Sequence, residues 1–148
     1  MVQVARKRKQ VCMQGARILL VEDDDVLRGV VERNLCARGH EVHLAIDVQS
    51  ALAQLRSYEF DLVLLDINLP DQTGWDILRI AQTEGHFLLH QVKKDQLPEG
   101  TLPVVVLSAV RVSPRRLAEF HPLAYLPKPF PMEAVLRLAA EAVPQDRQ

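Results

Sequence analysis

The stretch LVLLDINLP, residues 62–70, decides the fold of this chain. Four aliphatic residues in succession are typical of a strand that is buried on both faces of a parallel sheet. The run ends on a carboxylate, Asp66, which has no basic residue beside it in the sequence. An unpaired carboxylate inside a protein is costly. We therefore interpret Asp66 as the end of a strand at a functional edge of the sheet.

Further segments of the sequence alternate between strand and helix patterns. Apolar runs predict strands at 18–21, 41–46, 62–67, 102–109 and 124–129. Apolar residues at helical spacing predict a first helix from Leu27 until Gly39, and further helices at 48–55, 75–84, 113–120 and 132–143. Asp24 and Asp25 are expected to cap the first helix, and Asp47 the second. This alternation predicts an α/β fold with a doubly wound, five-stranded parallel sheet and helices on both faces.

Polar residues follow four of the predicted strands. Glu22 and Asp23 come after the first strand, while Asp66, Ser108 and Lys128 lie at the ends of the third, fourth and fifth. Ligands of such sheets bind beyond the carboxyl ends of the strands, so these groups should meet at one edge. Clustered carboxylates suit Mg²⁺, and an added ammonium and hydroxyl suit a phosphoryl group. Asp66 is then the natural nucleophile for phosphoryl transfer.

Four segments in the right order resemble the response-regulator receiver domain of two-component signalling. They are RILLVEDDDVLR, LVLLDINLPDQTGWDIL, VVVLSA and YLPKPF, and the resemblance covers about residues 17–143. It implies a flavodoxin-like sheet with strand order 2-1-3-4-5. We expect a flexible extension at 1–16, in which the basic RKRK has an open role, and a short tail at 144–148.

The resemblance also implies a metal-dependent phosphoacceptor site. Asp66 would accept the phosphoryl group. Glu22 and Asp23 would hold Mg²⁺ together with Asp66, and Asn68 would contribute its backbone carbonyl.

Three further roles follow from the same resemblance. Ser108 would be the switch hydroxyl that turns toward the phosphoryl oxygens, and Lys128 would contact the phosphoryl group. Tyr125 would be the switch aromatic whose rotamer follows the serine. Phosphorylation would then change the protein-binding face formed by the last two helices and the last strand.

The implied partners are a sensor histidine kinase or a histidine phosphotransfer domain, and a downstream protein target. A homodimer is an open alternative, and the chain is not expected to be a dedicated enzyme. The net charge of −1 argues against a general grip on nucleic acid or membrane. No apolar run approaches the roughly 18 residues that span a bilayer. Together with the unpatterned Cys12 and Cys36, these features favour a cytoplasmic location.

The sequence departs from the family pattern in two places. The interval from Asp66 to Ser108 is long, which predicts an insertion near 84–101. This insertion either extends the preceding helix, since 86–92 has helical character, or forms a surface excursion. The interval from Ser108 to Lys128 is slightly short and contains Pro114 and Pro122, so the helix within it should be short or irregular.

Two alternative functions remain. One is a receiver-like protein-binding scaffold that works without phosphate, although such domains usually lack part of the acid, serine and lysine set that this chain contains. The other is a Mg²⁺-dependent phosphatase of the haloacid-dehalogenase-like type. That family places a pair of acids two residues apart after the first strand, whereas Asp66 follows the third and Asn68 is not an acid.

Overall fold

The computed structural model describes residues 15–89 and 101–147. Its five strands form one parallel sheet in the order β2-β1-β3-β4-β5, which confirms the predicted order. The strands are β1 (Arg17–Val21), β2 (Glu41–Ala45), β3 (Leu62–Asp66), β4 (Leu102–Ser108) and β5 (Pro122–Pro127).

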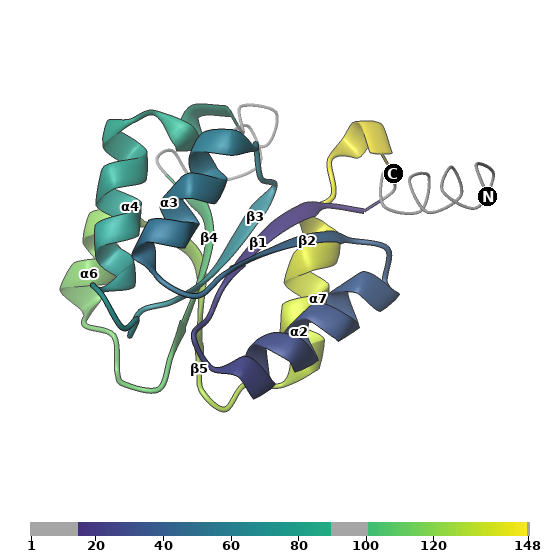
Figure 1. Cartoon of the computed structure of the whole chain (residues 1–148), viewed down its shortest axis with the longest axis horizontal. Helices are drawn as coiled ribbons and strands as arrows, with labels where there is room; N and C mark the ends of the chain where they lie inside the picture. The colour runs from purple at the N-terminus through teal and green to yellow at the C-terminus, as the bar shows by residue number, and fades with distance from the viewer. Residues whose placement is uncertain (1–14, 90–100, 148) are drawn as a thin grey trace.

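Helices cover both faces of this sheet. They are α2 (Asp25–Ala37), α3 (Val48–Ser57), α4 (Gly74–Thr83), α6 (Pro114–Phe120) and α7 (Met132–Glu141), with short 3-10 helices η1 (His86–Leu89) and η2 (Gln145–Arg147). Helices α2 and α7 lie on one face, while α3, α4 and α6 lie on the other (Figure 1). The predicted doubly wound architecture is therefore confirmed. None of the helices among the described residues combines the length and the apolar content needed to cross a membrane.

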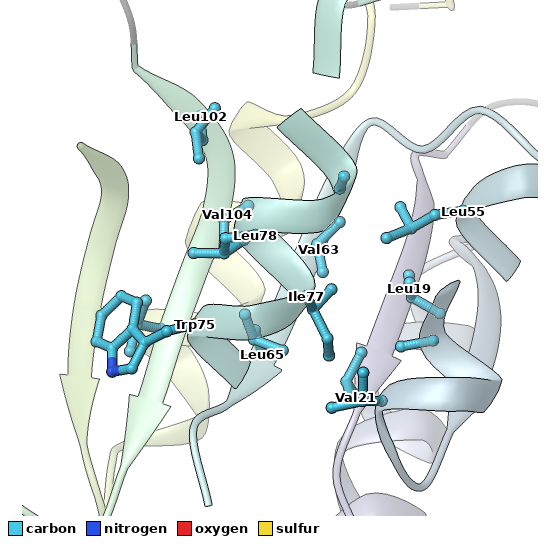
Figure 2. Close-up of a cluster of buried hydrophobic side chains, with 14 of the residues drawn as sticks. Leu19, Val21, Leu55, Val63, Leu65, Trp75, Ile77, Leu78, Leu102 and Val104 are labelled. Carbon is cyan, nitrogen blue, oxygen red and sulfur yellow. The ribbon is translucent and has the colours of Figure 1, made fainter. Parts of the chain in front are cut away.

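The core divides into two layers because successive strand residues point to opposite faces. In one cluster, Val63 and Leu65 lie near Ile77 and Leu78 of α4, and Leu19 lies near Leu55 of α3 (Figure 2). The alternate strand residues pack against α2 and α7 and include Ile18, Leu20, Leu64 and Val105. Burial on both faces explains why β1, β3 and β4 are near-continuous apolar runs.

Aspartates fix the first turns of α2 and α3, as predicted. The Asp24 carboxylate accepts hydrogen bonds from the backbone N–H groups of Val26 and Leu27, at 2.9 and 3.1 Å. The Asp47 carboxylate accepts one from the Ser50 N–H at 2.7 Å. The cap of α2 matters for the site because it fixes the chain directly after Glu22 and Asp23.

The connection from α6 to β5 differs in detail from the prediction. β5 begins at Pro122, two residues before the predicted start, because His121 ends α6 in the left-handed conformation with φ of 50°. That conformation is usually given to glycine or asparagine. α6 has seven residues, so the prediction of a short helix is confirmed.

The segment predicted as an insertion is described only in part. α4 ends at Thr83, Gly85 follows with φ of 79°, and a separate 3-10 turn spans His86–Leu89. The preceding helix therefore does not continue through His86. Residues 90–100 lie outside the described residues, as do residues 1–14 of the predicted extension.

Candidate functional site

The carboxyl ends of the strands bring the predicted polar residues together. The buried polar side chains among the described residues are Glu22, His40, Asp66 and Ser108, and three of these four belong to the predicted site. Glu22 and Ser108 are each 1% exposed and Asp66 is 4% exposed. Such burial needs polar partners, because an isolated carboxylate would protonate or destabilise the fold.

Lys128 supplies the compensating charge. Its Nζ lies 2.6 Å from Glu22 Oε1 and 3.3 Å from Asp66 Oδ2. The backbone N–H of Lys128 donates to the carbonyl of Ser108 at 2.8 Å, which fixes the lysine at the end of β5 beside β4. One half-buried ammonium thus contacts two buried carboxylates from β3 and from the end of β1.

The acidic groups form a cluster in which one ligand atom each from Glu22, Asp23 and Asp66 lies within 4.8 Å of the others. Burial raises the pKa of Glu22 to about 7; the hydrogen bond from Lys128 opposes this rise and the nearby Asp66 adds to it. Partial burial alone would lower the pKa of Lys128. Its hydrogen bond and charge interaction with Glu22, supported by Asp66, outweigh burial and raise that pKa.

The donor set fits Mg²⁺. Three carboxylates face one ammonium, so the cluster retains excess negative charge that a divalent cation would compensate. Carboxylate oxygens are hard ligands of the kind that Mg²⁺ prefers, and the exposed Asp23 leaves one side of the cluster open to solvent.

The chain after Asp66 makes a tight turn. The Asn68 N–H donates to Asp66 Oδ1 at 3.1 Å, and the Gly74 N–H donates to the Ile67 carbonyl at 2.8 Å. A Cβ at Gly74 would lie 2.6 Å from the Asp66 carbonyl oxygen, so only glycine allows this approach. The glycine of the PDQTG turn thus determines where the Asp66 backbone lies. Asn68 itself is exposed at this edge.

Ser108 and Tyr125 both donate to the backbone carbonyl of Val110. The Ser108 hydroxyl donates to the Val110 carbonyl at 2.8 Å and accepts from the Val110 N–H at 3.2 Å. The Tyr125 hydroxyl donates to the same carbonyl at 3.3 Å. A movement of the Val110 carbonyl would therefore disturb the hydrogen bonds of both side chains.

Sequence reasoning missed two residues that shape the site. Arg28 donates from Nη1 to the Glu22 carbonyl at 2.9 Å. The Asp71 carboxylate accepts from the backbone N–H groups of Val48 and Gln49 at 3.0 and 3.3 Å, so it ties the turn after β3 to the start of α3. Neither contact follows a local spacing rule, and no signal in the sequence could have found it.

Comparison with known proteins identifies what this chain is similar to. The family model described as the response regulator receiver domain matches residues 18–140. A probable transcriptional regulatory protein of Picosynechococcus sp. is 35% identical over 135 residues, covering 84% of this chain and 48% of that protein. The response regulator MprA of Mycolicibacterium vanbaalenii is 34% identical over 122 residues, covering 81% of this chain and 47% of that protein. The chain thus spans less than half the length of these curated relatives.

Solved structures share the fold. The chemotaxis protein CheY4 of Vibrio cholerae superposes with a TM-score of 0.67 at 25% identity, covering 83% of this chain and 94% of that one. The receiver domain of the sensor histidine kinase PA1611 from Pseudomonas aeruginosa superposes with a TM-score of 0.69 at 25% identity, covering 87% and 98%. The latter structure has a magnesium ion coordinated in its active site cleft.

Proposed function

The chain belongs to the response-regulator receiver domain family, and on this premise we propose that it is a phosphorylation switch whose phosphoacceptor is Asp66. We assign this function to residues 17–143. Receiver domains are signalling domains that receive phosphoryl groups from histidine kinases or phosphotransfer proteins, and are not dedicated enzymes. A phosphohistidine of such a partner is the donor we propose here.

The observation that carries the proposal is the position of Lys128 between Glu22 and Asp66. In the proposed step, an Asp66 carboxylate oxygen forms a bond to phosphorus while the phosphorus–nitrogen bond of the donor breaks. The bonding electron pair leaves with the histidine nitrogen. Lys128, 3.3 Å from Asp66 Oδ2, would neutralise charge on the phosphoryl oxygens.

We further propose that the acidic cluster holds Mg²⁺. Glu22, Asp23 and Asp66 would bind the ion with the backbone carbonyl of Asn68. When bound, it would supply positive charge to the phosphoryl oxygens. The proximity of the three carboxylates supports this assignment, as does the magnesium ion in the receiver domain of PA1611.

The signal would leave the site through Ser108 and Tyr125. A phosphoryl group on Asp66 offers new acceptor oxygens to the Ser108 hydroxyl, which donates a hydrogen bond to the Val110 carbonyl in this structure. If Ser108 turns toward the phosphate, the Val110 carbonyl loses one of its two hydroxyl donors and Tyr125 is free to change rotamer. The face formed by α6, β5 and α7 would then change its affinity for a downstream protein.

Intact mass spectrometry tests the proposal. The protein is incubated with Mg²⁺ and a small-molecule phosphodonor, in parallel with the Asp66→Asn variant. One phosphoryl group should appear on the wild type alone. Labelling of both proteins would refute Asp66 as acceptor. Labelling of neither, with Mg²⁺ binding demonstrated, would favour the phosphate-independent scaffold.

A further inference from the structure

We infer that Arg28 is a positioning residue that orients the carboxylates of Glu22 and Asp23 and thereby sets the Mg²⁺ affinity of the site. The inference rests on the proposed function, because it concerns the proposed ligands. Arg28 belongs to α2, and its side chain is only 17% exposed although its charge favours solvent.

The guanidinium of Arg28 folds back over the junction between β1 and α2. Its Nη1 donates to the Glu22 carbonyl at 2.9 Å and to the Asp23 carbonyl at 3.4 Å. Its Nη2 forms an ion pair with the exposed carboxylate of Asp25. The planar guanidinium can make these contacts together because its donors point in fixed, divergent directions.

The hydrogen bond from Arg28 is the second of two that hold the backbone of Glu22 in place. The Glu22 N–H donates to the Ala45 carbonyl of β2 at 3.0 Å. On the other side, Arg28 of α2 donates to the Glu22 carbonyl. Because the backbone is held on both sides, the direction in which the Glu22 side chain leaves it is fixed. That direction places its carboxylate on Lys128 and beside Asp66.

The positive charge of Arg28, taken alone, would have the opposite effect on Mg²⁺ affinity. A guanidinium beside the acidic cluster repels a divalent cation, so removing its charge should tighten Mg²⁺ binding if charge were its only effect. Removing a residue that positions the ligands should instead weaken binding, typically by tenfold or more for groups that orient metal ligands. The sign of the change in affinity therefore separates the two roles.

The test uses Arg28→Gln and Arg28→Lys in the full chain. The dissociation constant for Mg²⁺ is measured by titration with amide NMR shifts as the readout, and the unfolding midpoint is measured in EDTA. Arg33→Gln is the matched control, because Arg33 is an exposed arginine of the same helix. We expect Arg28→Gln to raise the dissociation constant about tenfold. Arg28→Lys should give an intermediate value, and Arg33→Gln should leave it unchanged.

Tighter or unchanged Mg²⁺ binding in Arg28→Gln overturns the inference, even if the unfolding midpoint falls, because Arg28 would then act only as a charge or as a brace of the fold. Absence of Mg²⁺ binding in the wild type would overturn the metal site of the proposed function, and the inference with it. Wild-type binding with weaker binding in Arg28→Gln supports both.

Discussion

Lys128 Nζ lies closer to Glu22 Oε1, at 2.6 Å, than to the proposed phosphoacceptor Asp66, at 3.3 Å from Oδ2, although Lys128 and Glu22 are 106 positions apart in the chain. The lysine is therefore held primarily by the acid that is proposed to bind Mg²⁺. A metal ion on Glu22 would compete with Lys128 for this carboxylate. We expect metal binding to direct the ammonium toward Asp66, where phosphate would arrive.

Replacing Lys128 should separate metal binding from phosphorylation. Lys128→Ala should accept phosphate from a small-molecule donor about 100-fold more slowly, because a charged donor to the phosphoryl oxygens is lost. Mg²⁺ binding should persist, since the carboxylates remain and a competing cation is gone. Time-resolved intact mass and a Mg²⁺ titration measure the two effects, with the exposed Arg137→Ala as control. Unchanged phosphorylation would contradict the role of Lys128.

The raised pKa of Glu22 predicts how the stability of the metal-free protein depends on pH. The pKa of Glu22 is about 7 in the folded protein against an ordinary 4.5, so between these values the folded state holds a proton that the unfolded state has released. The stabilising contribution is complete below pH 4.5 and is lost as the pH rises to about 7. In EDTA, the stability difference between wild type and Glu22→Gln should therefore shift against the wild type over this window.

Urea denaturation at several pH values measures that difference, and exposed Glu133→Gln is the control. A difference that does not change with pH would show that Glu22 ionises normally. Adding Mg²⁺ should restore wild-type stability above pH 7, because the ion favours the charged carboxylate.

Two glycine-to-alanine substitutions should have opposite effects on stability. At Gly74 a Cβ would lie 2.6 Å from the Asp66 carbonyl oxygen, so Gly74→Ala should cost about 1–3 kcal/mol and displace the Asp66 backbone. At Gly29, inside α2, the Cβ would meet only the flexible Arg33 side chain, at 3.1 Å. Gly29→Ala should stabilise by about 0.4–1 kcal/mol through reduced backbone entropy of the unfolded chain. Unfolding curves measure both, and a neutral Gly74→Ala would contradict the tight turn.

The hydrogen bond between His40 and Ala16, away from the proposed phosphoacceptor, should be sensitive to acid. Burial, with a smaller contribution from the charge of Arg38, lowers the pKa of His40 below 6.5. Its Nδ1 accepts the Ala16 N–H at 3.1 Å, which only the neutral ring can do. The unfolded state binds a proton first as the pH falls, so the contribution of His40 is present above pH 6.5 and lost below it.

His40→Asn keeps an acceptor near the position of Nδ1 but does not titrate. Between pH 7.5 and 5 the wild type should lose about 1 kcal/mol more stability than this variant. His121→Asn is the control, because His121 is exposed and asparagine tolerates its positive φ. Equal losses of stability in wild type and His40→Asn would show that the hydrogen bond between His40 and Ala16 does not cause the acid sensitivity.

The fold could be predicted because its signals are local. The apolar runs around Leu64 and Val105 indicate buried parallel strands, and capping residues such as Asp24 indicate where helices begin. The meeting of Glu22, Asp66 and Lys128 at one edge followed from the alternation of strands and helices alone.

The remaining features depend on contacts between distant or unpatterned residues. The cap that Asp71 gives to α3, the brace that Arg28 gives to the Glu22 peptide, and the preference of Lys128 for Glu22 all arise from side-chain geometry. The early start of β5 depends on the left-handed conformation of His121. Glycine at this position would have indicated such a helix end, but histidine does not predict it.

The central claim is that Asp66 itself becomes an acyl phosphate, and reductive trapping tests it most directly. After incubation with Mg²⁺ and a small-molecule phosphodonor, borohydride cleaves an aspartyl phosphate and reduces that side chain to homoserine, which peptide mapping locates. We predict homoserine at position 66, dependent on the phosphodonor and absent when Asp66 is replaced by asparagine. Homoserine at Asp23 or elsewhere, or none despite a phosphorylated protein, would contradict the account.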